Sequence, residues 1–169
     1  TLARQALAQG HRVWALSRGQ RPLPAGVKAL VADRRDPDAF AAALDGAGRN
    51  WDLAVDCIGY QPEDARQDLD IVAPKVAHLI FISTDFVFDP DTRLFPQPEA
   101  ALSYATQGYG FKKRQCEEIF LAAEKTPHWT AVRPCHIYGP GSLLGCLPRH
   151  GRDPELINRL RQGQRLALV

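Results

Sequence analysis

A tyrosine and a lysine four residues apart, Tyr109 and Lys113, form the pair with the clearest chemical potential in this sequence of 169 residues. They fall at the start of a segment with a helical pattern, and side chains four positions apart lie on one face of a helix. An ammonium group beside a phenol stabilises the phenolate and lowers its pKa. The pair therefore predicts a tyrosine that exchanges a proton near neutral pH, although the same spacing also arises by chance on a surface helix.

Short apolar runs elsewhere in the chain end in polar or turn residues. The runs at 11–16, 26–31, 52–58, 77–83 and 128–132 are typical of buried β-strands. In an open parallel sheet, ligands bind at the carboxyl ends of the strands, so the residues there are site candidates. These candidates are Ser17, Arg18, Asp33, Arg34, Cys57, Ile58, Gly59, Ser83, Thr84, Asp85 and the segment 134–137. Every strand must end in a turn, however, so none of these residues identifies a ligand site by itself.

Helical patterns alternate with these strands. The expected helices cover 1–10, 36–44, 62–75, 108–125 and 154–162, and a further strand begins at 165–169. Asp36 is the expected N-cap of the second helix, with Pro37 at its first position. In the helix at 108–125, Phe111, Ile119 and Phe120 are expected on one apolar side with Ala123. Alternation of strand and helix predicts an α/β fold, a doubly wound parallel sheet covered by helices on both faces.

The composition is that of a globular domain, with 45% hydrophobic residues and a formal net charge of +2. Near-neutral charge gives no electrostatic footprint for nucleic acid, and no apolar stretch is long enough to cross a bilayer. The four cysteines have neither CxxC spacing nor Cys/His ligand spacing, which argues against a structural metal site. No export signal opens the chain, so we expect reduced thiols and a cytoplasmic protein.

Both ends of the sequence are expected to be incomplete. The helix predicted at 1–10 leads directly into a strand, so a strand and a turn should precede it, and the chain stops inside an apolar run at Val169. We therefore expect a partial nucleotide-binding domain over 1–169, in which a substrate-binding part is missing or only begins at about 150–169. Apolar faces left uncovered would be exposed or covered by another chain, which makes a homo-oligomer possible.

Five segments in order resemble the extended short-chain dehydrogenase/reductases, the NAD(P)-dependent epimerase/dehydratase family. YGFKK at 109–113 is similar to the family's YxxxK helix, and ISTDFVF at 82–88 resembles the strand end that carries its catalytic Ser or Thr. RPCHIYGPG at 133–141 resembles the RPxxxYGPG loop. VAD at 31–33 and CIG at 57–59 lie where the family contacts the cofactor. The Gly-rich turn that the family places before its first helix is absent from this sequence.

The resemblance implies a role for each matched residue. Tyr109 would exchange a proton with the substrate oxygen, Lys113 would hold the nicotinamide ribose and depress the pKa of Tyr109, and Thr84 would donate a hydrogen bond to the same oxygen. Ser83 is expected to face the core. Asp85, Phe86 and His136 would lie near the substrate. The implied cofactor-binding residues are Ser17, Arg18, Asp33, Arg34, Cys57, Ile58, Gly59, Tyr109, Lys113, Pro134 and Ile137.

Cofactor and substrate class follow from departures within these motifs. The end of the predicted strand at 11–16 has Ser17 and Arg18 and no carboxylate, which favours NADP over NAD. Phe86 stands where the family's dehydratases have Glu, and STDFVF is closer to the dTDP-4-dehydrorhamnose reductase-like members. The resemblance implies reduction or epimerisation of a sugar-nucleotide or related carbonyl. Two alternatives stay open, namely a non-catalytic nucleotide- or RNA-associated member of the same fold, and an inert fragment.

Overall fold

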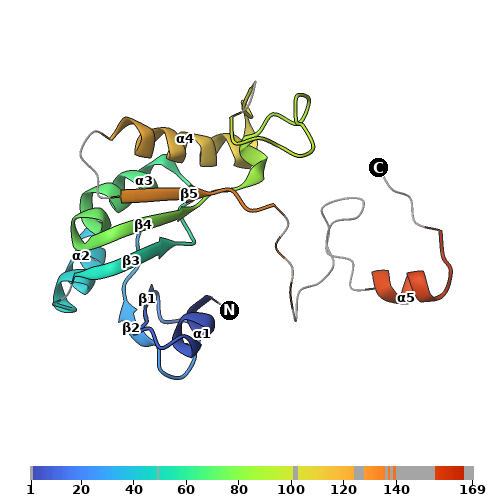
Figure 1. The fold of residues 1–169 in the computed structure, drawn as a ribbon. Coiled ribbons are helices and arrows are strands. Elements are labelled where there is room, and N and C mark those ends of the chain that lie inside the picture. Colours follow the sequence, from blue (N-terminus) through green and yellow to red (C-terminus); the bar gives the residue numbers. More distant parts are fainter. Residues whose placement is uncertain are drawn as a thin grey trace. The chain divides into compact units, whose positions relative to one another are not determined.

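The computed structural model describes residues 2–48, 50–100, 103–123, 128–135, 137, 139 and 155–165 (Figure 1). The chain divides into two compact units, Thr1–Arg133 and Pro134–Val169. The first unit carries the strands and four α-helices. The second contains one described helix, α5 (Leu156–Arg161), within the helix predicted at 154–162. The strand predicted at 165–169 lies outside the described residues except for its first position.

The strands of the first unit form two parallel sheets. β1 (Trp14–Ser17) pairs with β2 (Lys28–Val31), and β4 (Val76–Ile82) lies between β3 (Trp51–Asp56) and β5 (His128–Val132). All pairs are parallel, so their carboxyl ends lie at one edge of each sheet, and the predicted α/β class is confirmed. The predicted single sheet is replaced by these two, which meet through an edge-to-face contact between Trp14 and Trp51, with ring centroids 6.5 Å apart.

The helices begin close to the predicted positions. α1 is Leu2–Ala8, and α2 is Pro37–Gly46, where the Asp36 side chain accepts a hydrogen bond from the Ala39 N–H at 3.0 Å as an N-cap. The segment predicted as one helix at 62–75 is α-helical only in α3 (Pro62–Gln67). It then widens to a π-helix over Asp68–Val72 and tightens to a 3₁₀ turn over Ala73–Lys75.

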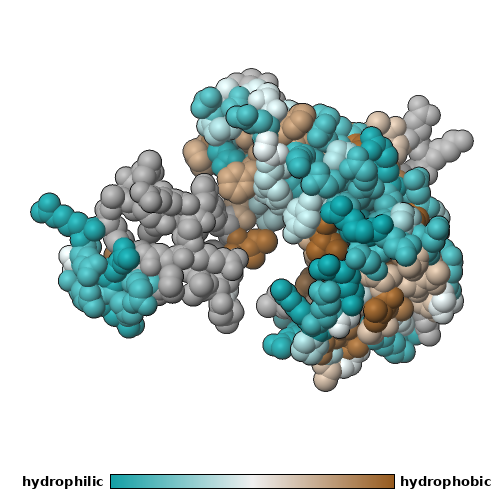
Figure 2. Space-filling view, turned by 180° about the vertical axis from the view of Figure 1, so that it is seen from behind, coloured by the Kyte–Doolittle hydropathy of each residue, from teal (hydrophilic) through white to brown (hydrophobic). Residues whose placement is uncertain are grey.

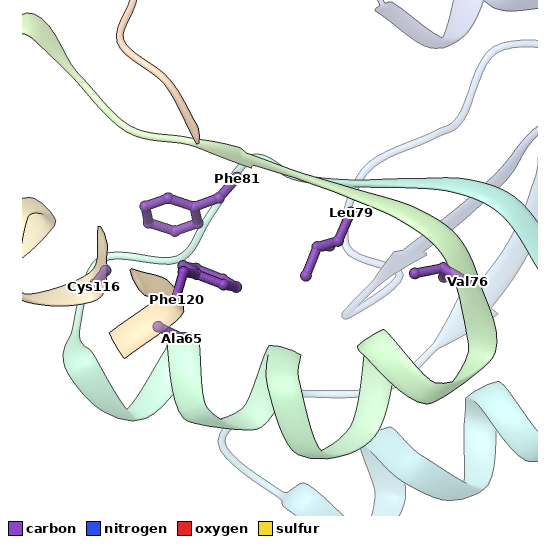
Figure 3. Packing of buried hydrophobic residues seen from close by; sticks show 6 residues of the cluster. All are labelled: Ala65, Val76, Leu79, Phe81, Cys116 and Phe120. Atoms are coloured by element: carbon purple, nitrogen blue, oxygen red, sulfur yellow. The ribbon is translucent and has the colours of Figure 1, made fainter. Parts of the chain in front are cut away.

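The core lies between β4 and two helices, α3 and α4 (Gly108–Ala122) (Figure 3). Leu79 and Phe81 of β4 pack against Ala65 of α3 and against Cys116 and Phe120 of α4. The rings of Phe81 and Phe120 are 5.1 Å apart between centroids. Both helices therefore cover the same face of this sheet. The contact between the buried rings of Phe81 and Phe120 sets the distance between α4 and β4.

Other apolar side chains reach the surface of the first unit (Figure 2). Leu53 and Val132, which align with His78 and Ile82 in the sheet register, are 49% and 40% exposed. They lie on the face of the sheet opposite to Leu79. The expected cover of helices on both faces is therefore not found over these strands within the described residues.

The buried side of α4 agrees with the prediction at Phe120, which is fully buried, and at Ile119, which packs against the core, and it differs from the prediction at Phe111. Phe111 lies at the surface with 36% of its area exposed, whereas the buried residues are Gly110, Lys113, Cys116, Glu117 and Phe120. These positions follow the 3.6-residue period of a helix. The helix therefore directs the charged side chains of Lys113 and Glu117 toward the strand ends, and Phe111 lies at the surface.

Within the described residues, no helix is both long enough and apolar enough to span a membrane.

The core assignment can be tested at two neighbouring positions of α4. Phe120→Ala removes a fully buried ring and should lower the free energy of unfolding by about 3–5 kcal/mol. Leu121→Ala, at a position 61% exposed, serves as the control and should change it by less than about 1 kcal/mol. Urea unfolding of both variants measures the difference, and equal losses would contradict the packing described above.

Candidate active site

Lys113 is buried at the point where β4 and the segment after β3 approach α4. Its side chain is 1% exposed, and Nζ donates hydrogen bonds to the carbonyl oxygens of Gly59 at 2.6 Å and Ile82 at 2.5 Å. Nζ also lies 4.2 Å from the ring centroid of Phe81. Burial lowers the pKa of Lys113, and the nearby Cys116, Asp56, Glu117 and Asp64 oppose that shift.

Thr84 and Tyr109 meet beside this lysine. Thr84, 5% exposed, caps the 3₁₀ turn Asp85–Val87, where its Oγ1 accepts a hydrogen bond from the Phe86 N–H at 3.2 Å. Tyr109 lies beside the same turn, with its ring centroid 6.4 Å from that of Phe86. Tyr109 is 46% exposed, and its ring centroid lies 6.2 Å from that of Tyr60. The structure thus brings a buried threonine, a half-open phenol and a buried ammonium together.

The pKa of Tyr109 departs from the sequence-based prediction. It is raised, first by burial and then by Tyr60, Asp85 and Cys116, while the hydrogen bond with Thr84 opposes the rise. The predicted lowering by Lys113 is therefore wrong for this arrangement, because the ammonium is directed to the two backbone carbonyls. Tyr109 is accordingly protonated at neutral pH.

Gly110 allows α4 to start directly against the turn that carries Thr84. A Cβ added at Gly110 would overlap the carbonyl group of Phe86, which is backbone and cannot move aside easily. The rings of Phe86 and Tyr109 are 6.4 Å apart between centroids. The absence of a side chain at Gly110 thus sets the separation of Tyr109 from Thr84.

A buried carboxylate, Glu117, lies one helical turn beyond Lys113. It accepts hydrogen bonds from the Ser83 hydroxyl at 2.6 Å, from Arg133 Nη2 at 2.8 Å and from Arg114 Nη1 at 3.1 Å. Burial raises the pKa of Glu117, but the bonds from Arg133 and Ser83 and the two guanidinium charges prevail and hold it below its usual value. Ser83 faces the core, as predicted. Sequence reasoning missed Glu117, whose only signal is its four-residue spacing from Lys113.

Arg34 has a different environment from the one predicted. Its guanidinium is 8% exposed and donates to Asp56 at 3.1 Å, to Asp68 at 2.9 Å and to the Gln67 side-chain oxygen at 3.1 Å. The Asp64 carbonyl also accepts from it at 3.2 Å. All three guanidinium nitrogens are engaged with the protein, and the Arg34 carbonyl accepts from Gln67 Nε2 at 2.8 Å, so the guanidinium is not directed to a cofactor.

The other predicted cofactor residues lie at the strand ends. Arg18 is exposed after β1, and Ser17 accepts a hydrogen bond from the Gly19 N–H at 3.3 Å. Asp33 accepts from the Arg35 N–H at 2.9 Å. After β3, Cys57 and Ile58 are exposed and Gly59 is buried. β1 and β3 belong to separate sheets, so the structure brings these residues to two strand edges rather than to one continuous edge.

The residues predicted near the substrate fall in different parts of the chain. Asp85 is tied to Arg93, whose Nη2 donates to the Asp85 carbonyl at 2.6 Å, and Phe86 is 40% exposed beside Tyr109. His136 lies outside the described residues. Pro134 and Ile137 belong to the second unit, so their contacts with nicotinamide stay a prediction. In the described part of the chain, no group of three His, Cys, Asp or Glu side chains is arranged to hold a metal ion.

Comparisons with known proteins give a consistent family. The model of the NAD dependent epimerase/dehydratase family matches residues 1–169. A 2'-dehydrokanamycin reductase from Streptomyces kanamyceticus is 30% identical over 81% of this chain, and a chloroplast stem-loop binding protein of 41 kDa from Arabidopsis thaliana is 26% identical over 82%. The chain spans 39% of the length of each of these relatives.

A solved structure shares the fold. The Bordetella bronchiseptica enzyme WbmG, in complex with NAD and UDP, superimposes with a TM-score of 0.63 at 19% identity, covering 97% of this chain and 56% of WbmG. At this identity the likeness concerns the fold alone.

The close approach at Gly110 predicts a difference between two glycines in helices. Gly110→Ala should destabilise the protein by about 1–3 kcal/mol, because the added Cβ meets backbone. Gly46→Ala in α2, where nothing lies within 4 Å, should be neutral or stabilising by up to about 1 kcal/mol. Thermal unfolding of the two variants separates these expectations, and a neutral Gly110→Ala would refute the role given to Gly110.

Proposed function

Because this chain belongs to the NAD dependent epimerase/dehydratase family, we propose that it carries the catalytic residues of an NAD(P)-dependent oxidoreductase or epimerase. The observation that supports this most is the meeting of Thr84, Tyr109 and Lys113 at the carboxyl end of β4. A threonine, a protonated phenol and a buried ammonium within one site suit the reduction of a carbonyl or the oxidation of a hydroxyl group.

In this proposal each residue has one task. Tyr109 gives its proton to the substrate oxygen, or accepts one from it, and its 46% exposure lets a substrate reach the phenol. Thr84 donates a hydrogen bond to the same oxygen and stabilises the charge that develops there. Lys113 holds the two segments of the site together, because its ammonium bonds both to the backbone after β3 and to the end of β4.

The described residues fit a nicotinamide dinucleotide. Two N–H groups of Lys113 are used by the carbonyls of Gly59 and Ile82. The third is proposed to donate to a ribose hydroxyl once dinucleotide binding makes the buried ammonium accessible. Ile58, 50% exposed after β3, offers apolar surface to a base or ribose. When bound, the dinucleotide supplies the acceptor or donor of hydride.

NADP is the proposed cofactor. Arg18 is exposed at the end of β1, where a guanidinium can pair with a 2′-phosphate. The related structure named above contains NAD, so the family supports a nicotinamide cofactor and Arg18 supports the finer choice.

The proposed substrate is a small molecule, a nucleotide sugar or a related carbonyl compound. The S. kanamyceticus relative is named a reductase, and the WbmG structure contains UDP. Phe86, at the surface beside Tyr109, is placed to contact a substrate, and Asp85 and His136 are proposed to do the same.

The three cysteines that the structure describes carry free thiols, which supports a cytoplasmic location.

In the whole protein, a further strand is proposed between β1 and β3. The described strands form two sheets, and β3 pairs with β4 on one side while its other edge is unpaired among the described strands. A strand at this position would unite the sheets and bring Arg18 and Ile58 to one edge. A substrate-binding part beginning at about 150–169 is proposed because the relatives are longer than this chain. A homo-oligomer is proposed because Leu53 and Val132 leave apolar surface exposed on the sheet.

The catalytic proposal is tested by Tyr109→Phe in the whole protein. Removing the phenol oxygen should lower kcat by about 10²–10⁴-fold with nucleotide sugars and NADPH. Dinucleotide affinity, measured by calorimetry, should stay within about threefold, because the ring is kept. Tyr60→Phe changes a neighbouring phenol and is the matched control.

Three outcomes distinguish the alternatives. A large loss with Tyr109→Phe and none with Tyr60→Phe supports the proposal. Equal activities of wild type and Tyr109→Phe would remove Tyr109 from the chemistry. Dinucleotide or RNA binding without turnover in either protein would favour the non-catalytic alternative, toward which the stem-loop binding relative points.

Cofactor choice is tested by Arg18→Ala. Wild type should bind NADP at least tenfold more tightly than NAD, because a guanidinium–phosphate contact contributes about 1.5–3 kcal/mol. The substitution should abolish this preference by weakening NADP binding while leaving NAD binding unchanged. Arg21→Ala, at another exposed position beyond β1, is the control. Equal affinities in wild type would contradict the proposal.

A further inference from the structure

Three carboxyl groups surround the single guanidinium of Arg34. Asp56, Asp64 and Asp68 all lie within 3.4 Å of its nitrogens, and the side chains of the four residues are between 3% and 10% exposed. If all three carboxyl groups were ionised, this buried cluster would carry two uncompensated negative charges. Buried charges without partners are costly, so one carboxyl group has a strong reason to keep its proton.

The hydrogen bonds show which carboxyl group this is. Asp56 accepts from Arg34 and from the N–H groups of Ile58 at 2.8 Å and Gly59 at 3.0 Å. Asp64 accepts from the N–H groups of Tyr60 at 2.8 Å and Gln61 at 3.0 Å. Both are therefore well supplied with donors, as carboxylates require.

Asp68 is different. Its Oδ1 accepts from Arg34 Nη2 at 2.9 Å, but its Oδ2 is buried with no donor among the described residues. The Asp56 carboxylate is its neighbour on the same guanidinium, because Arg34 Nη1 donates to Asp56 at 3.1 Å while Arg34 Nη2 donates to Asp68. Two ionised carboxylates cannot bond to each other, whereas a protonated Oδ2 would donate to Asp56 and would no longer lack a partner.

We propose that Asp68 is a neutral carboxylic acid that donates a hydrogen bond to Asp56, and that this pair positions the Cys57–Gly59 turn against Lys113. The positioning role of Asp68 rests on the proposed function, because it affects the proposed site through Lys113. Asp68 follows α3 directly and lies four residues after Asp64, so the two side chains lie on the same face of the helix.

The proton on Asp68 acts through a short series of contacts. Asp68 and Arg34 fix the Asp56 carboxylate, which holds the N–H groups of Ile58 and Gly59. The carbonyl of Gly59 then accepts from Lys113 Nζ at 2.6 Å. Gly59 has no room for a Cβ, which would overlap Asp56 Oδ2 and the Phe81 ring. Asp68 is thus a positioning residue rather than a catalytic one.

The charged surroundings agree with a retained proton. The pKa of Asp68 is raised to about 9, first by burial and then by the negative charge of Asp56, while Arg34 opposes the rise. Asp64 faces the cluster from its own helix segment. From α4, Lys113 interacts with Asp56 and Asp64, and the Cys116 thiol interacts with Asp68. A pKa raised above its unfolded value means that folding takes up a proton, so stability falls as pH rises from about 4 toward 9.

The first test observes the proton directly. Aspartate carboxyl carbons labelled with ¹³C are followed by NMR from pH 5 to 10 in wild type, Asp68→Asn and Asp70→Asn. One carboxyl group should stay protonated at pH 7 and titrate near pH 9, and this signal should vanish in Asp68→Asn alone. Asp70, exposed on the same π-helix, is the matched control. Ionisation of every aspartate at pH 7 in wild type would overturn the inference, whether or not the protein is an enzyme.

A second measurement addresses positioning. Asn at position 68 keeps a donor toward Asp56, so Asp68→Asn should bind NADP within threefold of wild type, whereas Asp68→Ala should bind at least tenfold more weakly. Between pH 5 and 8, the equilibrium constant for unfolding should rise more steeply with pH in wild type than in Asp68→Asn. The difference should reach up to about tenfold per pH unit. Equal NADP affinities of the Asn and Ala variants would refute the positioning role. If Asp68→Ala does not fold, the same affinity measurement is made on Asp56→Asn, which should bind NADP tenfold more weakly than wild type.

Discussion

The burial of the Lys113 ammonium is the constraint on which the rest of the site depends. A desolvated cation must be compensated inside the protein, and here two backbone carbonyls and the Phe81 ring do so. Those carbonyls belong to the ends of two structural segments, so β4 and the turn after β3 must both reach α4. Among the glycines that the structure describes, Gly59 and Gly110 have no space for a Cβ, and both lie at these approaches. Compensating the charge of Lys113 therefore brings the end of β4, the turn after β3 and α4 together at one site.

A second buried charge, Glu117, orients the other half of the site. Its bond to Ser83 fixes the residue before Thr84, and its ion pairs with Arg133 and Arg114 fix the end of β5 and the preceding turn of α4. Buried ion pairs contribute little net stability because desolvation offsets attraction, but each partner left alone would be costly. The value of Glu117 therefore lies in specifying a single arrangement of strand end and helix.

The sequence predicts the elements well where local signals are strong. The strand at 128–132 and the helix start at Asp36 and Pro37 agree with the structure. It fails where tertiary burial of polar groups decides. The helix predicted at 62–75 becomes a π-helix at Asp68, and α4 turns Lys113 and Glu117 inward instead of Phe111. Likewise, no local pattern separates Arg34, buried among carboxylates, from Arg18, which is exposed.

For the proposed chemistry, the environments of Tyr109 and Lys113 act in opposite directions. Burial raises the pKa of the phenol and lowers that of the ammonium, because it disfavours the charged form of each group. The phenol accordingly holds its proton at neutral pH, which is the state needed to donate to a carbonyl oxygen during reduction. Oxidation of a hydroxyl group needs the phenolate instead, and Thr84 is the contact that already favours it. Within the described residues, the arrangement is therefore poised toward proton donation, and any ligand that brings positive charge to the phenol shifts it toward the reverse direction.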